Sequence, residues 1–104
     1  MADWDELVER KVGGRVKAGS MFGSPGLRTG TKFFAVWWRD QLVLKLPAEQ
    51  RAQLISAGVA RQFEPMAGRP MNGWVVVDTS ADRAALVADA QDFVESLKTS
   101  PVAT

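Results

Sequence analysis

The sequence predicts an α+β domain with two layers, in which helices cover one face of an antiparallel sheet of about five strands. Apolar residues recur at helical spacing near both ends of the chain and again over residues 46–58. Between them, segments 31–38 (TKFFAVWW) and 41–46 (QLVLKL) are rich in aromatic and β-branched residues, which favour strands. Strands joined by short connections are typical of antiparallel sheets. The predicted order is α-β-β-β-α-β-β-α, in a single domain over residues 1–104.

The first predicted helix runs from Trp4 to Val12. Asp3 can cap its N-terminus, and the pair Gly13–Gly14 ends it. Residues 17–22 are interpreted as the first strand of the sheet.

Three glycines in the segment 19–32 (GSMFGSPGLRTGTK) raise the question of a phosphate-binding loop. In a Walker-type loop a lysine follows the last glycine directly, and a helix opens there. Here Thr31 precedes Lys32, Pro25 lacks a backbone N–H, and a strand is predicted next. The segment is therefore interpreted as a turn-rich link between the first two strands, in which the glycines permit tight turns.

The next two predicted strands, 31–38 and 41–46, form a hairpin about the turn Arg39–Asp40. With this turn Trp38 faces Gln41, and alternation along each strand sorts the side chains onto two faces. One face is wholly apolar and is expected to form the core; it holds Phe33, Ala35, Trp37, Leu42, Leu44 and Leu46. The other face is mixed and is expected to be partly exposed; it holds Lys32, Phe34, Val36, Trp38, Gln41, Val43 and Lys45.

A second helix is predicted over residues 46–58, because Pro47 suits its first turn and Gly58 ends it. The remaining predicted elements are short strands at 61–65 and 71–78, a last helix over 82–98 and a frayed tail at 99–104.

The composition argues against most catalytic chemistry. The chain has no cysteine and no histidine, so the commonest general base and the commonest metal ligand are both missing. We therefore predict no catalytic residue, no cofactor and no metal site. The N-terminus is acidic where a signal peptide is basic, and no stretch is long and apolar enough to span a membrane. A cytoplasmic location and no membrane partner are expected.

Basic residues are concentrated in the first half of the chain. From Arg10 to Arg39 there are seven basic residues and no acidic one, although the net charge is only +1. Basic residues interleaved with aromatic ones on a strand can hold phosphates and stack bases. A solvated basic face is the simpler alternative. The candidate surface for a partner or an anion comprises Arg28, Lys32, Phe34, Trp38, Arg39, Lys45 and Arg69.

Four motifs, in this order and spacing, resemble the N-terminal domain of bacterial TfoX/Sxy proteins, to which the YjbR/MmcQ group is related. The motifs are MFGSPGL (21–27), KFFAV (32–36), LVLKLP (42–47) and GRPMNGWVVV (68–77). The resemblance extends from about Leu7 to Leu97 and implies an α+β fold like that of secretion chaperones. This fold agrees with the order of elements predicted above.

The resemblance also implies a binding or regulatory protein rather than an enzyme. TfoX is similar to regulators of competence for DNA uptake that act on transcription, and proteins of the related group are often labelled DNA-binding. The family offers no catalytic residues to carry over. Three hypotheses follow. The first is a non-enzymatic binding or regulatory module that acts through the mixed sheet face or the basic N-terminal half, with nucleic-acid binding as one form of it. The second is a protein-interaction or homodimer surface that includes Phe34, Trp38 and Val43, and the third is a small-ligand-binding protein or enzyme with a pocket near Lys45 and Arg69.

Overall fold

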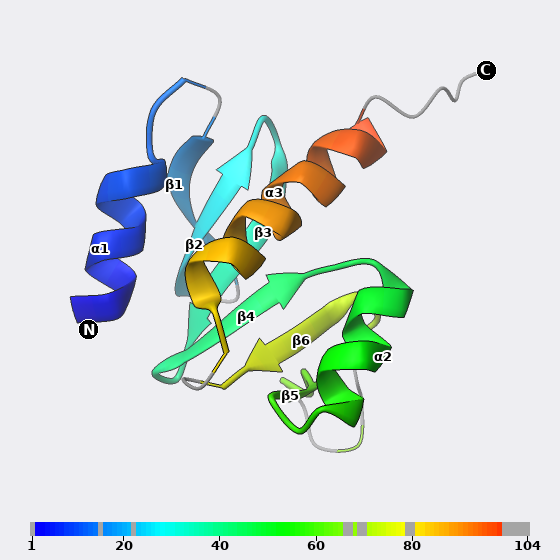
Figure 1. Cartoon of the computed structure of the whole chain (residues 1–104). Helices are drawn as coiled ribbons and strands as arrows, with labels where there is room; N and C mark the ends of the chain where they lie inside the picture. Colours follow the sequence, from blue (N-terminus) through cyan, green and yellow to red (C-terminus); the bar gives the residue numbers. More distant parts are fainter. Residues whose placement is uncertain are drawn as a thin grey trace.

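The computed structural model describes residues 2–14, 16–21, 23–65, 68, 71–78 and 81–98. Its strands form one sheet in the order β1-β2-β3-β4-β6-β5, and each strand is antiparallel to its neighbours (Figure 1). The elements are α1 (Ala2–Lys11), β1 (Val16–Met21), β2 (Ser24–Thr29), β3 (Lys32–Trp38), β4 (Gln41–Lys45), α2 (Ala48–Ser56), β5 (Ala60–Gln62), β6 (Trp74–Val77) and α3 (Arg83–Lys98).

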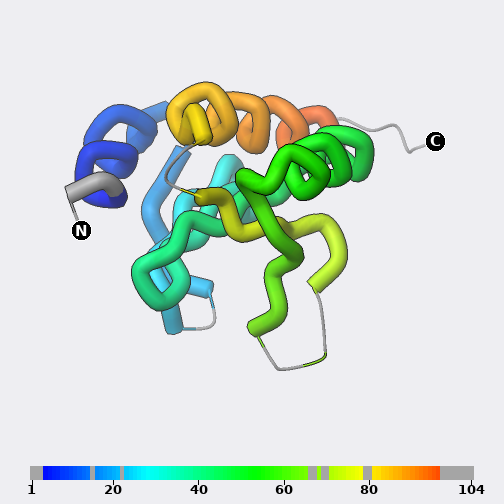
Figure 2. Tube along the Cα trace, turned by 60° about the horizontal axis from the view of Figure 1, so that its bottom comes forward, coloured from blue at the N-terminus to red at the C-terminus, as the bar shows by residue number. Residues whose placement is uncertain are grey.

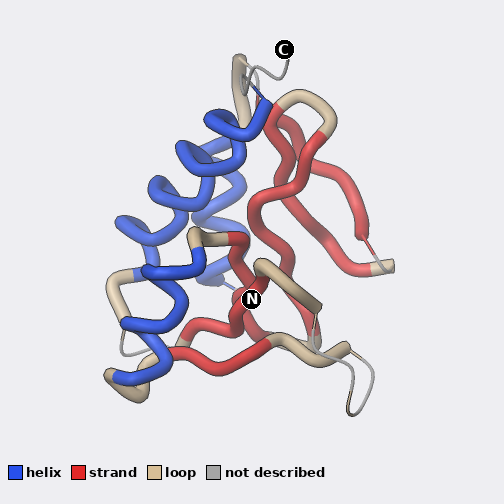
Figure 3. Tube along the Cα trace, turned by 90° about the vertical axis from the view of Figure 1, so that its right-hand side faces the viewer, coloured by secondary structure: helices blue, strands red, loops and turns tan. Residues whose placement is uncertain are grey.

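The helices form one layer and the sheet forms the other. Figure 2 shows α1, α3 and α2 along one side of the sheet, and Figure 3 shows the same separation of helices from strands in a second view. The predicted fold class is confirmed, and the structure adds a sixth strand to the sheet. Within the described part of the chain, no helix has the length and apolar character needed to cross a membrane.

The added strand is β2, which lies in the segment interpreted as a link. It pairs with β1 on one side and with β3 on the other. Proline and glycine disfavour strands, but β2 gains ladder hydrogen bonds from two neighbours. The turns at its ends use glycines at positive φ, 73° at Gly23 and 64° at Gly30. Because β3 and not a helix follows, the segment does not form a phosphate cradle of the Walker type.

The predicted hairpin register is confirmed. Trp38 pairs with Gln41, Trp37 with Leu42, and Ala35 with Leu44. The two turn residues both have positive φ, 50° at Arg39 and 64° at Asp40. A two-residue turn with positive φ at both positions matches the twist of the flanking strands.

A β-bulge changes the faces of the two phenylalanines in β3. Leu27 pairs with Ala35 and the next residue, Arg28, pairs with Phe33, so Phe34 is an extra residue without a partner in β2. Phe34 is 0% exposed and packs in the core beneath the helices, while Phe33 packs with residues of the opposite face. The prediction that Phe34 is exposed and Phe33 is in the core was therefore wrong.

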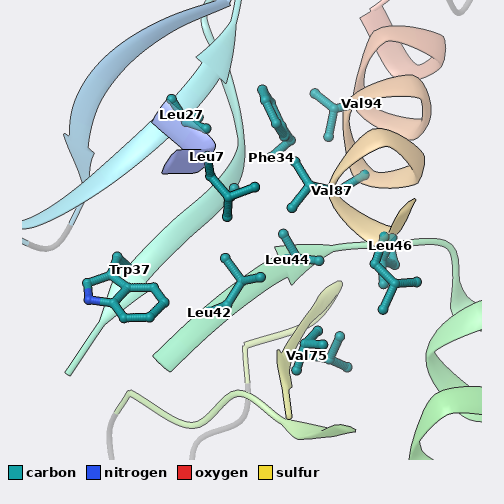
Figure 4. Packing of buried hydrophobic residues seen from close by; sticks show 14 of the residues in the cluster. Leu7, Leu27, Phe34, Trp37, Leu42, Leu44, Leu46, Val75, Val87 and Val94 are labelled. Carbon is teal, nitrogen blue, oxygen red and sulfur yellow. The ribbon is translucent and has the colours of Figure 1, made fainter. Parts of the chain in front are cut away.

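The main core lies between the sheet and the helices. Figure 4 shows Phe34 of β3 beside Val87 and Val94 of α3, with Leu44 of β4 below Val87, and all four belong to one buried cluster. At the other side of this core, the Trp4 and Trp37 rings stack with centroids 5.9 Å apart. Helix α1 is thus attached to the sheet through an aromatic pair.

A second apolar cluster lies on the face of the sheet that carries no helix. Val36 and Val43 belong to this face, as predicted, but they are 1% and 0% exposed. They are buried with Phe63, Trp74 and Val76. Because this cluster covers the centre of the face, the exposed part of the face lies around it.

The other predicted elements are close to the observed ones. The predicted strand at 61–65 is observed as β5, and the one at 71–78 as β6. The tail predicted at 99–104 lies outside the described residues.

Candidate anion-binding face

The side of the sheet opposite the helices, here called the helix-free face, is the candidate site. Residues that pair across neighbouring strands lie on the same face, and the two clusters of buried residues show which face that is. Its positions are Lys17, Gly19, Met21, Ser24, Gly26, Arg28, Phe33, Val36, Trp38, Gln41, Val43, Lys45, Arg61, Trp74 and Val76.

The charged strand positions of this face have one sign. Lys17, Arg28, Lys45 and Arg61 are its charged strand positions, and none of the positions named above is acidic. The acidic residues nearest to these positions in the sequence, Asp40, Glu64 and Asp78, follow β3, β5 and β6 outside the strands. The strand positions therefore carry net positive charge, with Glu64 only in the hollow at the edge of the face, and such a surface attracts anions.

Two cations, Lys45 of the face and Arg39 of the adjoining turn, lie over tryptophan rings. The guanidinium carbon of Arg39 is 5.0 Å from the centroid of Trp38. The Lys45 Nζ is 5.9 Å from the centroid of Trp74, its cross-strand partner. Both distances are within the range of cation–π attraction, which holds each charge near the face.

Two small residues make room for an aromatic ring on the same face. Gly19 and Gly26 pair across β1 and β2. A Cβ atom at Gly26 would lie 2.9 Å from Cδ2 of Phe33, and one at Gly19 would lie 3.2 Å from Cζ of the same ring. The half-buried Phe33 ring therefore fills the space that side chains at these two positions would occupy, next to Arg28. Arg28 itself is oriented by a 2.6 Å hydrogen bond that its guanidinium donates to the Gly30 carbonyl.

A hollow of about 300 Å³ opens at the edge of this face. The rings of Trp38 and Phe63 lie edge to face beside it, with centroids 5.6 Å apart and planes at 80°. The residues that line it are Trp38, Gln41, Arg61, Gln62, Phe63, Glu64 and Val76.

The structure brings together only part of the predicted candidate surface. Arg28, Trp38 and Lys45 lie on the helix-free face, and Arg39 lies over Trp38. Lys32 pairs with Thr29, whose hydroxyl donates a 2.8 Å hydrogen bond to Glu95 of α3, so Lys32 lies on the helix side.

Of the other two members of that surface, Phe34 does not contribute, because it is buried in the main core. Arg69 lies outside the described residues. The expected apolar interface of Phe34, Trp38 and Val43 is not formed, because Phe34 and Val43 are both 0% exposed. The hollow beside Trp38 does not include Lys45 among its lining residues. A pocket near Lys45 and Arg69 stays a prediction, because Arg69 lies outside the described residues.

Three residues of the face were not predicted as part of the site. Lys17 and Arg61 are single basic residues in short strands, and nothing in their local sequence indicates which face they occupy. Strict alternation of side chains along residues 31–38 places Phe33 on the opposite face, but the bulge in β3 changes its face. Among the described residues, no group of three or more acidic side chains is placed to hold a metal ion.

The fold and this face together define a small two-layer α+β domain with one basic, aromatic sheet surface. The family model of the TfoX N-terminal domain matches residues 6–96, nearly the whole chain, and the chain belongs to this family. No curated protein matches the chain with significance. The resemblance inferred from the four sequence motifs is thereby confirmed.

Proposed function

We propose that this domain is a non-enzymatic module that binds nucleic acid through its helix-free face, in a regulatory role linked to transcription. One observation carries the proposal: the strand positions of this face include four basic residues and no acidic residue. A phosphate backbone is the polyanion that such a surface attracts most strongly. The absence of histidine and cysteine from the chain supports a binding role rather than catalysis.

The charges are spread over a length that suits a polymer. Lys17 is on β1 and Arg61 is on β5, the two outer strands of the sheet. Five strand spacings separate them, which corresponds to about 24 Å. A small anion would contact one of these charges, whereas a nucleic-acid strand can contact several at once.

The aromatic residues favour a single strand over a duplex. Phe33 and Trp38 are half-buried, so each ring keeps exposed surface beside a cation. Unpaired bases stack on such rings, while the bases of a duplex are already stacked on one another. We therefore expect single-stranded oligonucleotides to bind more tightly than duplexes of equal length.

The proposal is tested by the salt dependence of binding. A fluorescent single-stranded oligonucleotide is titrated with the protein by anisotropy between about 50 and 200 mM salt. The variant Lys17→Ala/Arg61→Ala removes two exposed cations from opposite edges of the face. It is expected to weaken binding for every sequence and to reduce the slope of log K against log salt by about 0.7 per lost phosphate contact.

The matched control removes the same charge from the other layer. In Arg10→Ala/Lys11→Ala the two lost cations belong to the last turn of α1. This variant is expected to bind with nearly the wild-type slope. Equal losses in the two double variants would show that only net charge matters, and no binding at the lowest salt would refute the proposal.

A further inference from the structure

We propose that the hollow beside Trp38 receives one unpaired nucleobase, and that Glu64 makes it favour bases with an exocyclic amino group. This inference rests on the proposed binding of nucleic acid by the helix-free face. The hollow would then be the place on that face where the protein distinguishes one nucleotide sequence from another.

The shape of the hollow suits a flat aromatic ligand. Trp38 and Phe63 form two walls at 80° to each other, so a ring that stacks on Trp38 presents its edge to the face of Phe63. Val76, which is 5% exposed, forms an apolar part of the lining. The volume of about 300 Å³ is at the lower end of the range for small-molecule sites, as expected for a single ring system.

The remaining lining residues can read the edge of such a ring. Gln41, the cross-strand partner of Trp38, offers both a donor and an acceptor. Arg61, the partner of Val76, offers donors only, and Glu64 offers acceptors only. Hydrogen bonds of this kind to base edges, combined with aromatic stacking, are how proteins recognise unpaired bases.

Cations beside the hollow can hold the sugar–phosphate chain on either side of the bound base. Arg39 lies over Trp38 on the β3–β4 hairpin, and Arg61 lies on β5 across the hollow. Both residues are exposed. A strand that follows the basic face is therefore brought to the hollow by contacts that do not depend on its sequence.

The carboxylate of Glu64 selects among bases because it can only accept hydrogen bonds. Cytosine and adenine each present an amino group that donates to it, and thymine presents a carbonyl oxygen at the corresponding position. A carboxylate facing that carbonyl would leave both acceptors without a donor. Oligo-dC is therefore expected to bind about 5- to 10-fold more tightly than oligo-dT, within the discrimination typical of a specific base contact.

The test compares three labelled strands of equal length and charge: oligo-dC, oligo-dT and an abasic strand that has only sugar and phosphate. For the wild-type protein we expect affinity to fall in that order. In Glu64→Gln the preference for dC over dT is expected to fall below about twofold, because the amide also donates. Glu49→Gln, an equal change of charge at an exposed residue of α2, is expected to keep the preference.

A second variant tests the stacking part of the inference. Trp38→Ala is expected to weaken binding of oligo-dC by about 5- to 150-fold, which corresponds to the energy of one stacked base. The affinity for the abasic strand is expected to stay within twofold, since that strand has no base to stack.

The outcomes separate this inference from the proposed function. Equal binding of all three strands by the wild-type protein would overturn the nucleobase site and leave the basic face intact. Weak binding of the abasic strand with equal affinity for dC and dT would support the stacked base and overturn the role of Glu64. No binding of any strand at low salt would overturn the proposed function itself.

Discussion

Gly26 shows how one missing side chain shapes the helix-free face. A Cβ atom at this position would lie 2.9 Å from Cδ2 of Phe33 and 3.0 Å from the backbone carbonyl oxygen of Ala35. The ring could turn away, but the carbonyl belongs to the neighbouring strand and is fixed by the ladder. We predict that Gly26→Ala lowers the free energy of unfolding by about 1–3 kcal/mol, as overpacking of a core does.

Gly19 provides the matched comparison, because it pairs with Gly26 and faces the same ring. There the closest atom to a new Cβ is Cζ at the far end of Phe33, at 3.2 Å, and no backbone atom is among its three nearest atoms. Gly19→Ala is expected to cost less than half as much. Urea denaturation followed by tryptophan fluorescence measures both values, and an equal loss in the two variants would show that the Ala35 carbonyl is not the decisive contact.

The exchange of Phe33 and Phe34 could not be foreseen from the residues themselves. Both are phenylalanines, so the composition of β3 does not indicate which of the two faces the main core. The bulge that decides between them arises where β3 meets β2, and β2 was not predicted as a strand. The positions after the bulge, from Ala35 to the turn, were predicted correctly because the hairpin fixes their register.

At the scale of elements, the β3–β4 hairpin is held in register by an unusual turn. Such turns favour glycine or asparagine at positive φ, whereas this one has Arg39 and Asp40 at 50° and 64°. We predict that Asp40→Gly raises the free energy of unfolding by about 0.5–1 kcal/mol, because relief of the strained backbone outweighs the entropy that glycine gains in the unfolded chain. The midpoint of thermal unfolding would rise by a few degrees.

Gly30, in the neighbouring β2–β3 turn, tests the same physical argument in reverse. It has the same φ of 64°, so Gly30→Ala places a side chain in the left-handed region and should lower the midpoint. Circular dichroism melts of both variants measure the effect. If Asp40→Gly were neutral or destabilising, the side chain of Asp40 would have to stabilise the turn in a way that offsets its strain.

The helices and the hairpin were predictable because their signals are local, while β2 depends on its neighbours. Trp38 and Gln41 flank a two-residue turn, and Pro47 and Gly58 bracket the helical pattern of α2. Residues 24–29 (SPGLRT) contain a proline and a glycine and lack the alternation of a strand. They form one because β1 and β3 pair with them on both sides. For the same reason the sequence does not predict that Lys17 and Arg28 lie on the same face of the sheet.

At the scale of the whole molecule, the two sides of the sheet have different roles. The helix side contains the main core and a polar contact between layers, in which the Thr29 hydroxyl and the Gln91 amide both donate to Glu95 Oε2, at 2.8 and 3.0 Å. The helix-free side has a smaller core surrounded by cations. Stability should therefore depend mostly on residues of the helix side, and affinity for nucleic acid on residues of the other.

Two tryptophans, one on each side, test this division. Trp4 is 4% exposed and stacks on Trp37 to attach α1 to the sheet. Trp4→Ala is predicted to lower the free energy of unfolding by about 3–5 kcal/mol, and the thermal midpoint by at least about 10 °C. Below that midpoint its affinity for a single-stranded oligonucleotide should stay within twofold of the wild type, because no part of α1 lies on the helix-free face.

Trp38→Ala should give the opposite pattern. Trp38 is half-buried and packs only at the margin of the second cluster, so its loss should cost less stability than the loss of Trp4. It also removes a wall of the hollow, so the affinity for a single strand that carries bases should fall sharply. Melting curves give the thermal midpoint of each variant, and anisotropy titrations give its affinity for the oligonucleotide. A proportional loss of stability and affinity in both variants would mean that binding reports only the folded fraction and that the helix-free face has no special part in it.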